Sequence, residues 1–253
     1  MRRIDTRGAT LAVHDTGTGP PVVLLHGLGL DHSIFDALCA HLPHHRIIRP
    51  DLRGHGASSV PPAPYAMGAM TGDVEQVLDA LEVRDAVVLG LSLGGMIAQA
   101  LAIKRLDLVR GLCLVSTAAK IGQPGQWHDR AALALSGGMT AVLDASLKRW
   151  GGPDAPAART AFTTTDPQGY AGGCAAIAGT DLYTPTSGLR LPTLGIAGDR
   201  DGSTPPDLVR ETTGLIPGSD FALIRGAGHL CPATHPADVA RHLSAFLSRI
   251  GHV

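Results

Sequence analysis

The chain contains 253 residues, of which 44% are hydrophobic and 17% are charged, and its 21 basic and 22 acidic side chains leave a net charge of −1. This balance excludes an intrinsically disordered chain, which combines low hydrophobicity with high net charge, and argues against a nucleic-acid partner, which requires a basic excess. The length suits one globular domain with a large buried core and room for an insertion.

Short apolar segments that are typical of β-strands recur along the chain. Residues 11–14 and 22–25 indicate an early hairpin, because a cluster of turn residues at 17–21 lies between them. Further strands are predicted at Ile47 and Ile48 and over residues 87–89, 112–115, 193–197 and 221–224.

Helix-like segments lie between several of these strands. Residues 34–42 favour a helix, residues 73–81 repeat apolar side chains at helical spacing, and residues 236–250 form an amphipathic segment that begins with proline. Strands that are apolar on both faces and separated by helices indicate an α/β fold, with a mostly parallel central sheet flanked by helices on both sides.

The region from residue 119 to residue 185 interrupts this alternation. It is rich in Ala, Gly and Thr, contains both tryptophans, and shows helical segments without a convincing strand. We therefore predict a core formed by residues 1–118 and 186–253, with residues 119–185 inserted as a small helical cap above the sheet.

Cysteine spacing and the N-terminus bear on the cellular location. None of the four cysteines belongs to a C-x-x-C pair, so we expect buried reduced thiols, no metal site and a cytoplasmic protein. No apolar stretch follows Arg2 and Arg3, which argues against a signal peptide. Residues 86–103 carry no charge, but their glycines divide them into a strand, a tight turn and a helix, so no membrane span is expected.

The strongest chemical signal is the G-x-S-x-G sequence of residues 90–94, which follows the predicted strand 87–89 and precedes a helical run. This sequence forces a sharp turn from strand to helix, so that the hydroxyl of Ser92 projects above the sheet. The N-terminus of the helix favours a developing negative charge beside that hydroxyl. We therefore predict that Ser92 is a catalytic nucleophile.

A nucleophilic serine needs a base, and the base needs an orienting acid. Among twelve histidines we favour His229, because it follows the last predicted strand on a loop at the carboxyl edge of the sheet. Asp201 and Asp199 are both candidates for the acid. Asp201 is preferred because it lies further out on its loop, and Asp199 would then stabilise a turn.

Two backbone N–H groups are expected to form an oxyanion hole. One belongs to Leu93, directly after the nucleophile, and the other to Leu28, in the loop after the strand 22–25. Each such donor typically lowers the barrier by about 3–4 kcal/mol. His26, in the same loop as Leu28, is interpreted as a packing residue.

The loop of residues 51–58 reads Asp-Leu-Arg-Gly-His-Gly-Ala-Ser. We interpret it as a rigid support of the site that contains an internal ion pair between Asp51 and Arg53. Together, His26-Gly27, this loop, the serine turn, Asp201 and His229 resemble the α/β-hydrolase superfamily. The resemblance implies an α/β-hydrolase fold, a Ser-Asp-His catalytic triad in that chain order and no cofactor.

Several segments of the cap and of the second half of the core are similar to 3-oxoadipate enol-lactonases: residues 116–122, Trp127, 138–139, 147–150, 169–177, 194–198 and 228–230. This narrower resemblance implies hydrolysis of a small enol-lactone that carries an acetate arm, in aromatic catabolism. Ser92 would attack the ring carbonyl with His229 as base, the leaving group would be an enolate, and water would release 3-oxoadipate from the acyl-enzyme.

An anionic substrate of this kind requires a cation in the pocket. Arg149, Lys120 and Arg130 lie in the predicted cap and are the candidates, and each is otherwise a solvated surface charge. Trp127 and Trp150 are expected either to line the substrate pocket or to pack the cap against the core.

The sequence leaves other functions open. The chain is alternatively a carboxylesterase or another lactonase, or a cofactor-free perhydrolase, haloperoxidase-like enzyme or lyase on the same fold. A non-enzymatic ligand receptor on this scaffold is a third class. We expect a small-molecule lactone or ester as the partner, with no nucleic acid and no membrane, and the sequence leaves homo-oligomerisation open.

Overall fold

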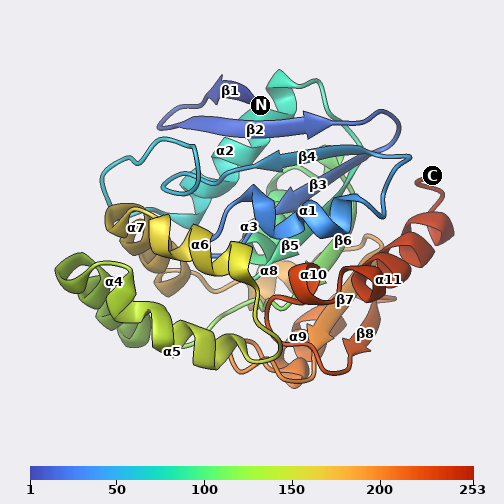
Figure 1. Cartoon of the computed structure of the whole chain (residues 1–253). Helices are drawn as coiled ribbons and strands as arrows, with labels where there is room; N and C mark the ends of the chain where they lie inside the picture. Colours follow the sequence, from blue (N-terminus) through green and yellow to red (C-terminus); the bar gives the residue numbers. More distant parts are fainter.

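The computed structural model describes residues 1–253 as a twisted eight-stranded sheet with helices on both faces (Figure 1). The strands are β1 (Arg2–Asp5), β2 (Thr10–Thr16), β3 (Pro21–Leu25), β4 (Arg46–Pro50), β5 (Ala86–Leu91), β6 (Val109–Val115), β7 (Thr193–Gly198) and β8 (Asp220–Ile224). Their order in the sheet is β1-β2-β4-β3-β5-β6-β7-β8. β2 pairs antiparallel with β1 and β4, and the other five pairs run parallel.

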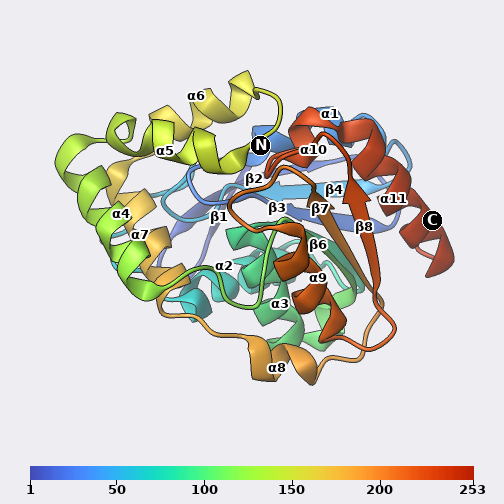
Figure 2. The same cartoon turned by 90° about the horizontal axis from the view of Figure 1, so that it is seen from below.

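Helices cover the sheet in two layers, which Figure 2 shows on opposite sides of the strands. One layer contains α2 (Met67–Ala80), α3 (Leu93–Lys104), α8 (Tyr183–Ser187) and α9 (Pro206–Gly214). The other contains α1 (Asp36–Cys39), α10 (Cys231–Thr234) and α11 (Pro236–Arg249). Short 3₁₀ helices are η1 (His32–Phe35) and η2 (Leu106–Leu108). None of the helices combines the length and the apolar character that crossing a membrane requires.

Burial of the central strands explains why the sequence forms this sheet. Every residue of β5 is buried, and Val87, Val88 and Leu89 have no exposed surface. A parallel strand that is covered on both faces needs such a continuous apolar run. α11 instead buries only one stripe, through Val239, Leu243 and residues near its end, so it packs on the sheet with a polar outer face. The core is therefore centred on β3, β5 and β6.

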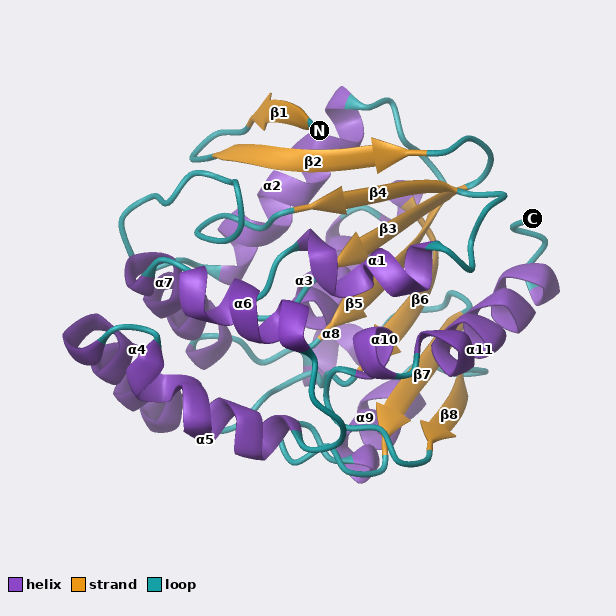
Figure 3. Ribbon diagram, in the orientation of Figure 1, coloured by secondary structure: helices purple, strands orange, loops and turns teal.

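Four consecutive helices follow β6 within the region where the sequence predicts helices without a strand. They are α4 (Pro124–Gly137), α5 (Thr140–Trp150), α6 (Pro156–Thr164) and α7 (Pro167–Ala178). α4, α6 and α7 each begin with proline, whose missing N–H is not needed in the first turn. Figure 3 shows these cap helices grouped on the side of the molecule toward which β3 and β5 point.

Two of the predicted elements differ in the structure. The early hairpin is wrong, because β2 pairs with β4, and β3 lies between β4 and β5. The turn residues at 17–21 reverse the chain, but the fully buried run Val22–Leu25 needs partners on both of its edges, and β4 and β5 provide them. The predicted helix over residues 34–42 is split into η1 and a short α1 that ends at Cys39.

Candidate active site

The turn between β5 and α3 holds Ser92 in an unusual backbone conformation, with φ 55° and ψ −116°. A residue other than glycine at positive φ costs about 1–3 kcal/mol, so the surrounding structure must impose it. A Cβ on Gly90 would lie 2.3 Å from the carbonyl oxygen of Gly94, and a Cβ on Gly94 would lie 2.1 Å from that of Leu25. Both glycines of the G-x-S-x-G sequence are therefore required by the close approach of β5, α3 and β3.

Hydrogen bonds to the neighbouring strand fix this turn. The backbone N–H of Ser92 donates to the carbonyl oxygen of Val115 at the end of β6, at 3.0 Å. The Thr117 hydroxyl donates to the carbonyl oxygen of Ser92 at 2.6 Å. Since both of its backbone polar groups are engaged, Ser92 keeps its place while its side chain lines a cavity.

His229 and Asp201 form a buried pair at the same edge of the sheet. The Nδ1 of His229 lies 2.9 Å from Oδ2 of Asp201, and the two side chains are 5% and 0% exposed. Because a carboxylate accepts this hydrogen bond, Nδ1 carries the proton and Nε2 is left as the proton acceptor of the ring. His229 lines the same cavity as Ser92.

Asp201 is held in place and ionised by donors on its own loop. Its Oδ1 accepts the backbone N–H groups of Ser203 at 2.7 Å and Thr204 at 3.0 Å, and the Thr204 hydroxyl donates to Oδ2 at 2.8 Å. Burial opposes ionisation of Asp201, but His229 and the Thr204 donors outweigh it and hold its pKa below the usual value.

The structure distinguishes the two aspartates that the sequence offers as candidates for the orienting acid. Asp201 contacts the imidazole, whereas Oδ1 of Asp199 accepts the backbone N–H of Gly226 at 2.8 Å and links the two loops. Ser203 and Thr204 were not singled out from the sequence. Their position directly after Asp201 was the available signal, because an aspartate commonly accepts amides two or three residues ahead.

A cavity of about 410 Å³ opens between the core and the cap helices. This volume lies in the range of sites that bind small molecules. The core contributes side chains that include Leu28, Leu30, Ser92, Ser203 and His229, and the cap contributes Ile121, Trp127, Asp129, Arg130, Arg149, Trp150 and Phe162. The predicted nucleophile and base are therefore brought to one cavity, together with both tryptophans.

The two predicted oxyanion donors flank Ser92. Leu93 is the first residue of α3, so its N–H is one of the amides that have no acceptor within the helix. Leu28 lines the cavity, and no protein group accepts its N–H. Both amides are consequently available to an oxygen bound beside the serine hydroxyl.

The cap brings two arginines to this cavity without any acidic partner. Arg149 lines the cavity, and its Nη2 is buried with no hydrogen-bond partner. Burial, and then the guanidinium of Arg130, lower the pKa of Arg149. Arg130 donates to the hydroxyls of Ser146 at 3.0 Å and Tyr170 at 2.5 Å, both neutral groups. Neither guanidinium forms an ion pair with a carboxylate, although the acidic side chain of Asp129 also lines the cavity.

The structure does not bring Lys120 to this cavity. Its ammonium pairs with the carboxylate of Asp181 at 3.1 Å, and both side chains are exposed to solvent. Lys120 precedes the cavity residue Ile121 in the chain, but its charged end lies at the surface. The expectation that it binds substrate is corrected: of the three candidate cations, only Arg149 and Arg130 line the cavity.

Both tryptophans line the cavity, as one of the two expectations has it, and each also packs against other residues of the cap. Trp150 meets Phe162 edge to face, with ring centres 5.3 Å apart, and is 9% exposed. The indole N–H of Trp127 donates to the carbonyl oxygen of Ile121 at 2.6 Å, and the Arg130 guanidinium lies 4.9 Å from the ring centre. All of these contacts lie within residues 119–185, so they order the cap itself.

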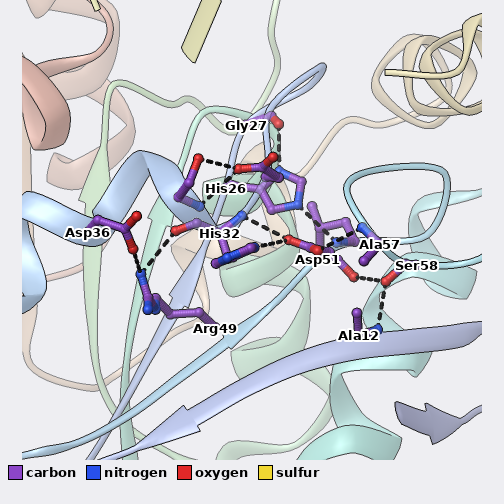
Figure 4. Close-up of polar contacts among 12 residues, drawn as sticks. Ala12, His26, Gly27, His32, Asp36, Arg49, Asp51, Ala57 and Ser58 are labelled. Atoms are coloured by element: carbon purple, nitrogen blue, oxygen red, sulfur yellow. Dashed lines mark hydrogen bonds and ion pairs between the residues drawn. The ribbon is translucent and has the colours of Figure 1, made fainter. Parts of the chain in front are cut away.

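A buried network around Asp51 supports the loop that carries Leu28 (Figure 4). Oδ1 of Asp51 accepts the backbone N–H and Nδ1–H of His32, at 2.9 and 2.8 Å, and Oδ2 accepts the N–H of Ala57 at 2.9 Å. Leu52 donates its N–H to Nε2 of His26 at 2.9 Å. Burial lowers the pKa of His26, which keeps this ring neutral and able to accept. Asp51 and His26 thereby join two loops beside the site.

The internal ion pair predicted for this loop is wrong. Arg53 donates to both carboxylate oxygens of Asp73 in α2, at 2.5 and 2.7 Å, and not to Asp51. The carboxylate of Asp51 is instead occupied by His32 and Ala57. Sequence proximity suggested the pair, but the loop directs the two side chains to different neighbours.

Comparisons with known proteins identify the family of the chain. A family described as the alpha/beta hydrolase fold matches residues 20–236. The 3-oxoadipate enol-lactonase 2 of Acinetobacter baylyi is 32% identical over 194 residues, which cover 73% of this chain and 73% of that protein.

Solved structures give the same result over the whole chain. The enol-lactonase of Burkholderia xenovorans LB400 has a TM-score of 0.93 and 34% identity, covering 98% of this chain and 100% of that one. A thermophilic esterase from Thermogutta terrifontis, with malate bound, has a TM-score of 0.93 and 29% identity over 100% of both chains. The chain belongs to the α/β-hydrolase-fold family. The fold class and the family resemblance predicted from the sequence are confirmed.

The Asp51 network predicts a pH-dependent contribution to stability. Burial opposes ionisation of Asp51, but the hydrogen bonds from His32 and Ala57 hold its pKa at about 2. Because this is below the unfolded value of about 3.9, the ionised carboxylate stabilises the fold above pH ~4, and the contribution disappears as the pH falls toward 2. Asp51→Asn should therefore lower the free energy of unfolding by about 2 kcal/mol at pH 7.

Urea unfolding of the wild type and Asp51→Asn at pH 7, pH 4 and pH 3 measures this effect. The difference between the two proteins should shrink as the pH falls. Asp144→Asn, at an exposed position of α5, is the matched control and should change stability little at any pH. An equal loss for Asp51→Asn at all three pH values would contradict the electrostatic explanation.

Proposed function

We propose that this chain is a serine hydrolase that cleaves a small lactone or ester through an acyl-enzyme, with Ser92, His229 and Asp201 as its catalytic triad. One observation carries the proposal: Ser92, on its strained turn, lines the same cavity as a histidine whose Nδ1 is held by a buried carboxylate. A nucleophile, a base and an orienting acid in this arrangement are the requirements for acyl transfer.

In the proposed first step, the Oγ of Ser92 attacks the substrate carbonyl while Nε2 of His229 takes its proton. Asp201 stabilises the imidazolium that forms, through the bond to Nδ1. The N–H groups of Leu28 and Leu93 donate to the oxyanion, and each contributes about 3–4 kcal/mol of stabilisation in the transition state. Collapse of the intermediate breaks the ester bond, and the imidazolium gives its proton to the leaving oxygen.

Water completes the proposed cycle. His229 removes a proton from water, the resulting hydroxide attacks the acyl carbonyl, and Ser92 leaves with the proton that the imidazolium returns. In a lactone the leaving oxygen belongs to the same molecule as the acyl group, so ring opening leaves the whole substrate attached to Ser92 until this step.

For the substrate, we infer 3-oxoadipate enol-lactone or a close analogue with a free carboxylate, used in aromatic catabolism in the cytoplasm. Arg149 and Arg130 supply unpaired positive charge inside a cavity of about 410 Å³, which suits a small anion. The named enol-lactonases at 32% and 34% identity support this substrate class. The similar esterase from Thermogutta terrifontis has malate bound, and malate is itself a small carboxylate.

A carboxylesterase acting on small anionic esters is the second candidate. The esterase from Thermogutta terrifontis matches the whole chain with the same TM-score as the enol-lactonase, which favours this alternative. Turnover of the purified protein on 3-oxoadipate enol-lactone, unsubstituted lactones and p-nitrophenyl esters separates the two. A clear preference for the esters would overturn the enol-lactonase proposal and leave the serine mechanism intact.

Ser92→Ala should abolish this hydrolysis without unfolding the protein. The substitution removes the attacking oxygen, so kcat should fall by about 10³-fold or more, toward the residual rate given by binding and the oxyanion donors. Circular dichroism and the unfolding midpoint check that the fold is retained. Activity near that of the wild type would contradict the assignment of the nucleophile.

Arg149→Ala should weaken binding of the anionic substrate selectively. Loss of a charge-assisted contact worth about 1.5–3 kcal/mol should raise KM for the carboxylate-bearing lactone roughly 10- to 100-fold. KM for a neutral p-nitrophenyl ester should change far less. Lys120→Ala removes a cap cation that lies outside the cavity and is the matched control. Equal effects of Arg149→Ala on both substrates would argue against an anion-binding role.

A further inference from the structure

The last turn of the cap helix α5 contacts both loops that carry the proposed acid and base. The carbonyl oxygen of Arg149 accepts the backbone N–H of Gly202, next to Asp201, at 2.9 Å. The carbonyl oxygen of Trp150 accepts the backbone N–H of His229 itself, at 2.6 Å. The last carbonyl groups of a helix receive no hydrogen bond from within the helix, so these two are free to accept from the loops.

The segment after α5 then approaches the His229 loop backbone to backbone. Gly152 has φ +69°, and a Cβ there would lie 2.4 Å from the backbone nitrogen of Gly228. A Cβ on Gly228 would lie 2.2 Å from the carbonyl oxygens of both Trp150 and Gly151. Real Cβ atoms do not approach other atoms so closely. Neither Gly152 nor Gly228 can therefore carry a side chain while this contact is kept.

The loop of Asp201 is attached to the same place. The backbone N–H of Arg200 donates to the carbonyl oxygen of Ala227 at 2.9 Å, which links the acid loop to the histidine loop. The side chains of Arg149 and Trp150 meanwhile line the cavity. One turn of the cap therefore provides side chains to the substrate cavity and carbonyl groups to the loops of the base and the acid.

We infer that residues 149–152 form a positioning segment, in which Gly152, with Gly228 opposite, sets the place of the His229 imidazole relative to Ser92. This inference rests on the proposed function, because it gives His229 the role of base. Its consequence is that this end of the cap and the base move together. The Arg149 charge then stays at a fixed place relative to the reacting serine.

Gly152→Ala is the direct test, and the chain offers a matched control. Gly138, at the junction of α4 and α5, has φ +72°, but a Cβ there would meet nothing within 4 Å. Both substitutions place an alanine at a similar positive φ, and only Gly152→Ala also pushes a Cβ against the His229 loop. We expect kcat for p-nitrophenyl acetate to fall about 10²-fold in Gly152→Ala, with KM within about twofold, since small displacements of reacting groups have effects of this size. Gly138→Ala should stay within about twofold of the wild type.

Rates are expressed per competent site, counted by titration with a fluorophosphonate, so that simple loss of folded protein does not imitate the effect. The double variant Gly152→Ala/Gly228→Ala should lose little more than the worse single variant, because both changes break one contact. Multiplicative losses, or an equal fall in Gly138→Ala, would overturn the inference.

Hydrogen exchange tests the same contact without using activity. In the unaltered protein, the backbone N–H of His229 should exchange far more slowly than that of an exposed loop residue such as Gly218, because Trp150 accepts it. An unprotected His229 amide would overturn the inference even if Gly152→Ala failed to fold. A protected amide in a protein whose hydrolysis does not depend on Ser92 would instead overturn the proposed function.

Discussion

Ser92 keeps a positive φ because β5, α3 and β3 approach one another too closely at this turn for any other path of the chain. The carbonyl oxygen of Leu25 lies where a side chain on Gly94 would begin, so the strand that leads to the Leu28 loop is pressed against the start of α3. This single contact places the serine hydroxyl, the Leu93 amide and the Leu28 loop within one small region. The other loops at this edge of the sheet are arranged around it.

Electrostatic selectivity in this molecule is local. The net charge of −1 gives no general attraction for an anion, and most cations of the chain form ion pairs with carboxylates. Arg149 and Arg130 differ because their partners are neutral hydroxyls, aromatic rings or nothing. Recognition of a carboxylate in the proposed function depends on these two side chains, which the cap places; the backbone carbonyl of Arg149 is also bound to the loop of the acid.

Local patterns predicted what depends on local physics. The sequence identifies the buried run of β5, the serine turn and the loops of Asp201 and His229. Strand burial, a tight turn and position at a sheet edge are each determined by a few neighbouring residues. Strand pairing was not predictable in this way, since the insertion of β4 between β2 and β3 joins residues far apart in sequence. The partners of Lys120 and Arg53 were missed for the same reason: Asp181 and Asp73 reach them only through the fold.

Labelling of the folded protein with a small fluorophosphonate, followed by peptide mapping with mass spectrometry, tests the central claim most directly. A serine activated by its turn and by His229 should react alone, so we predict one adduct per chain, on the peptide that contains Ser92, and none after unfolding in urea. A folded protein that hydrolyses esters while Ser92 stays unlabelled, or that carries the adduct on another residue, would contradict this account.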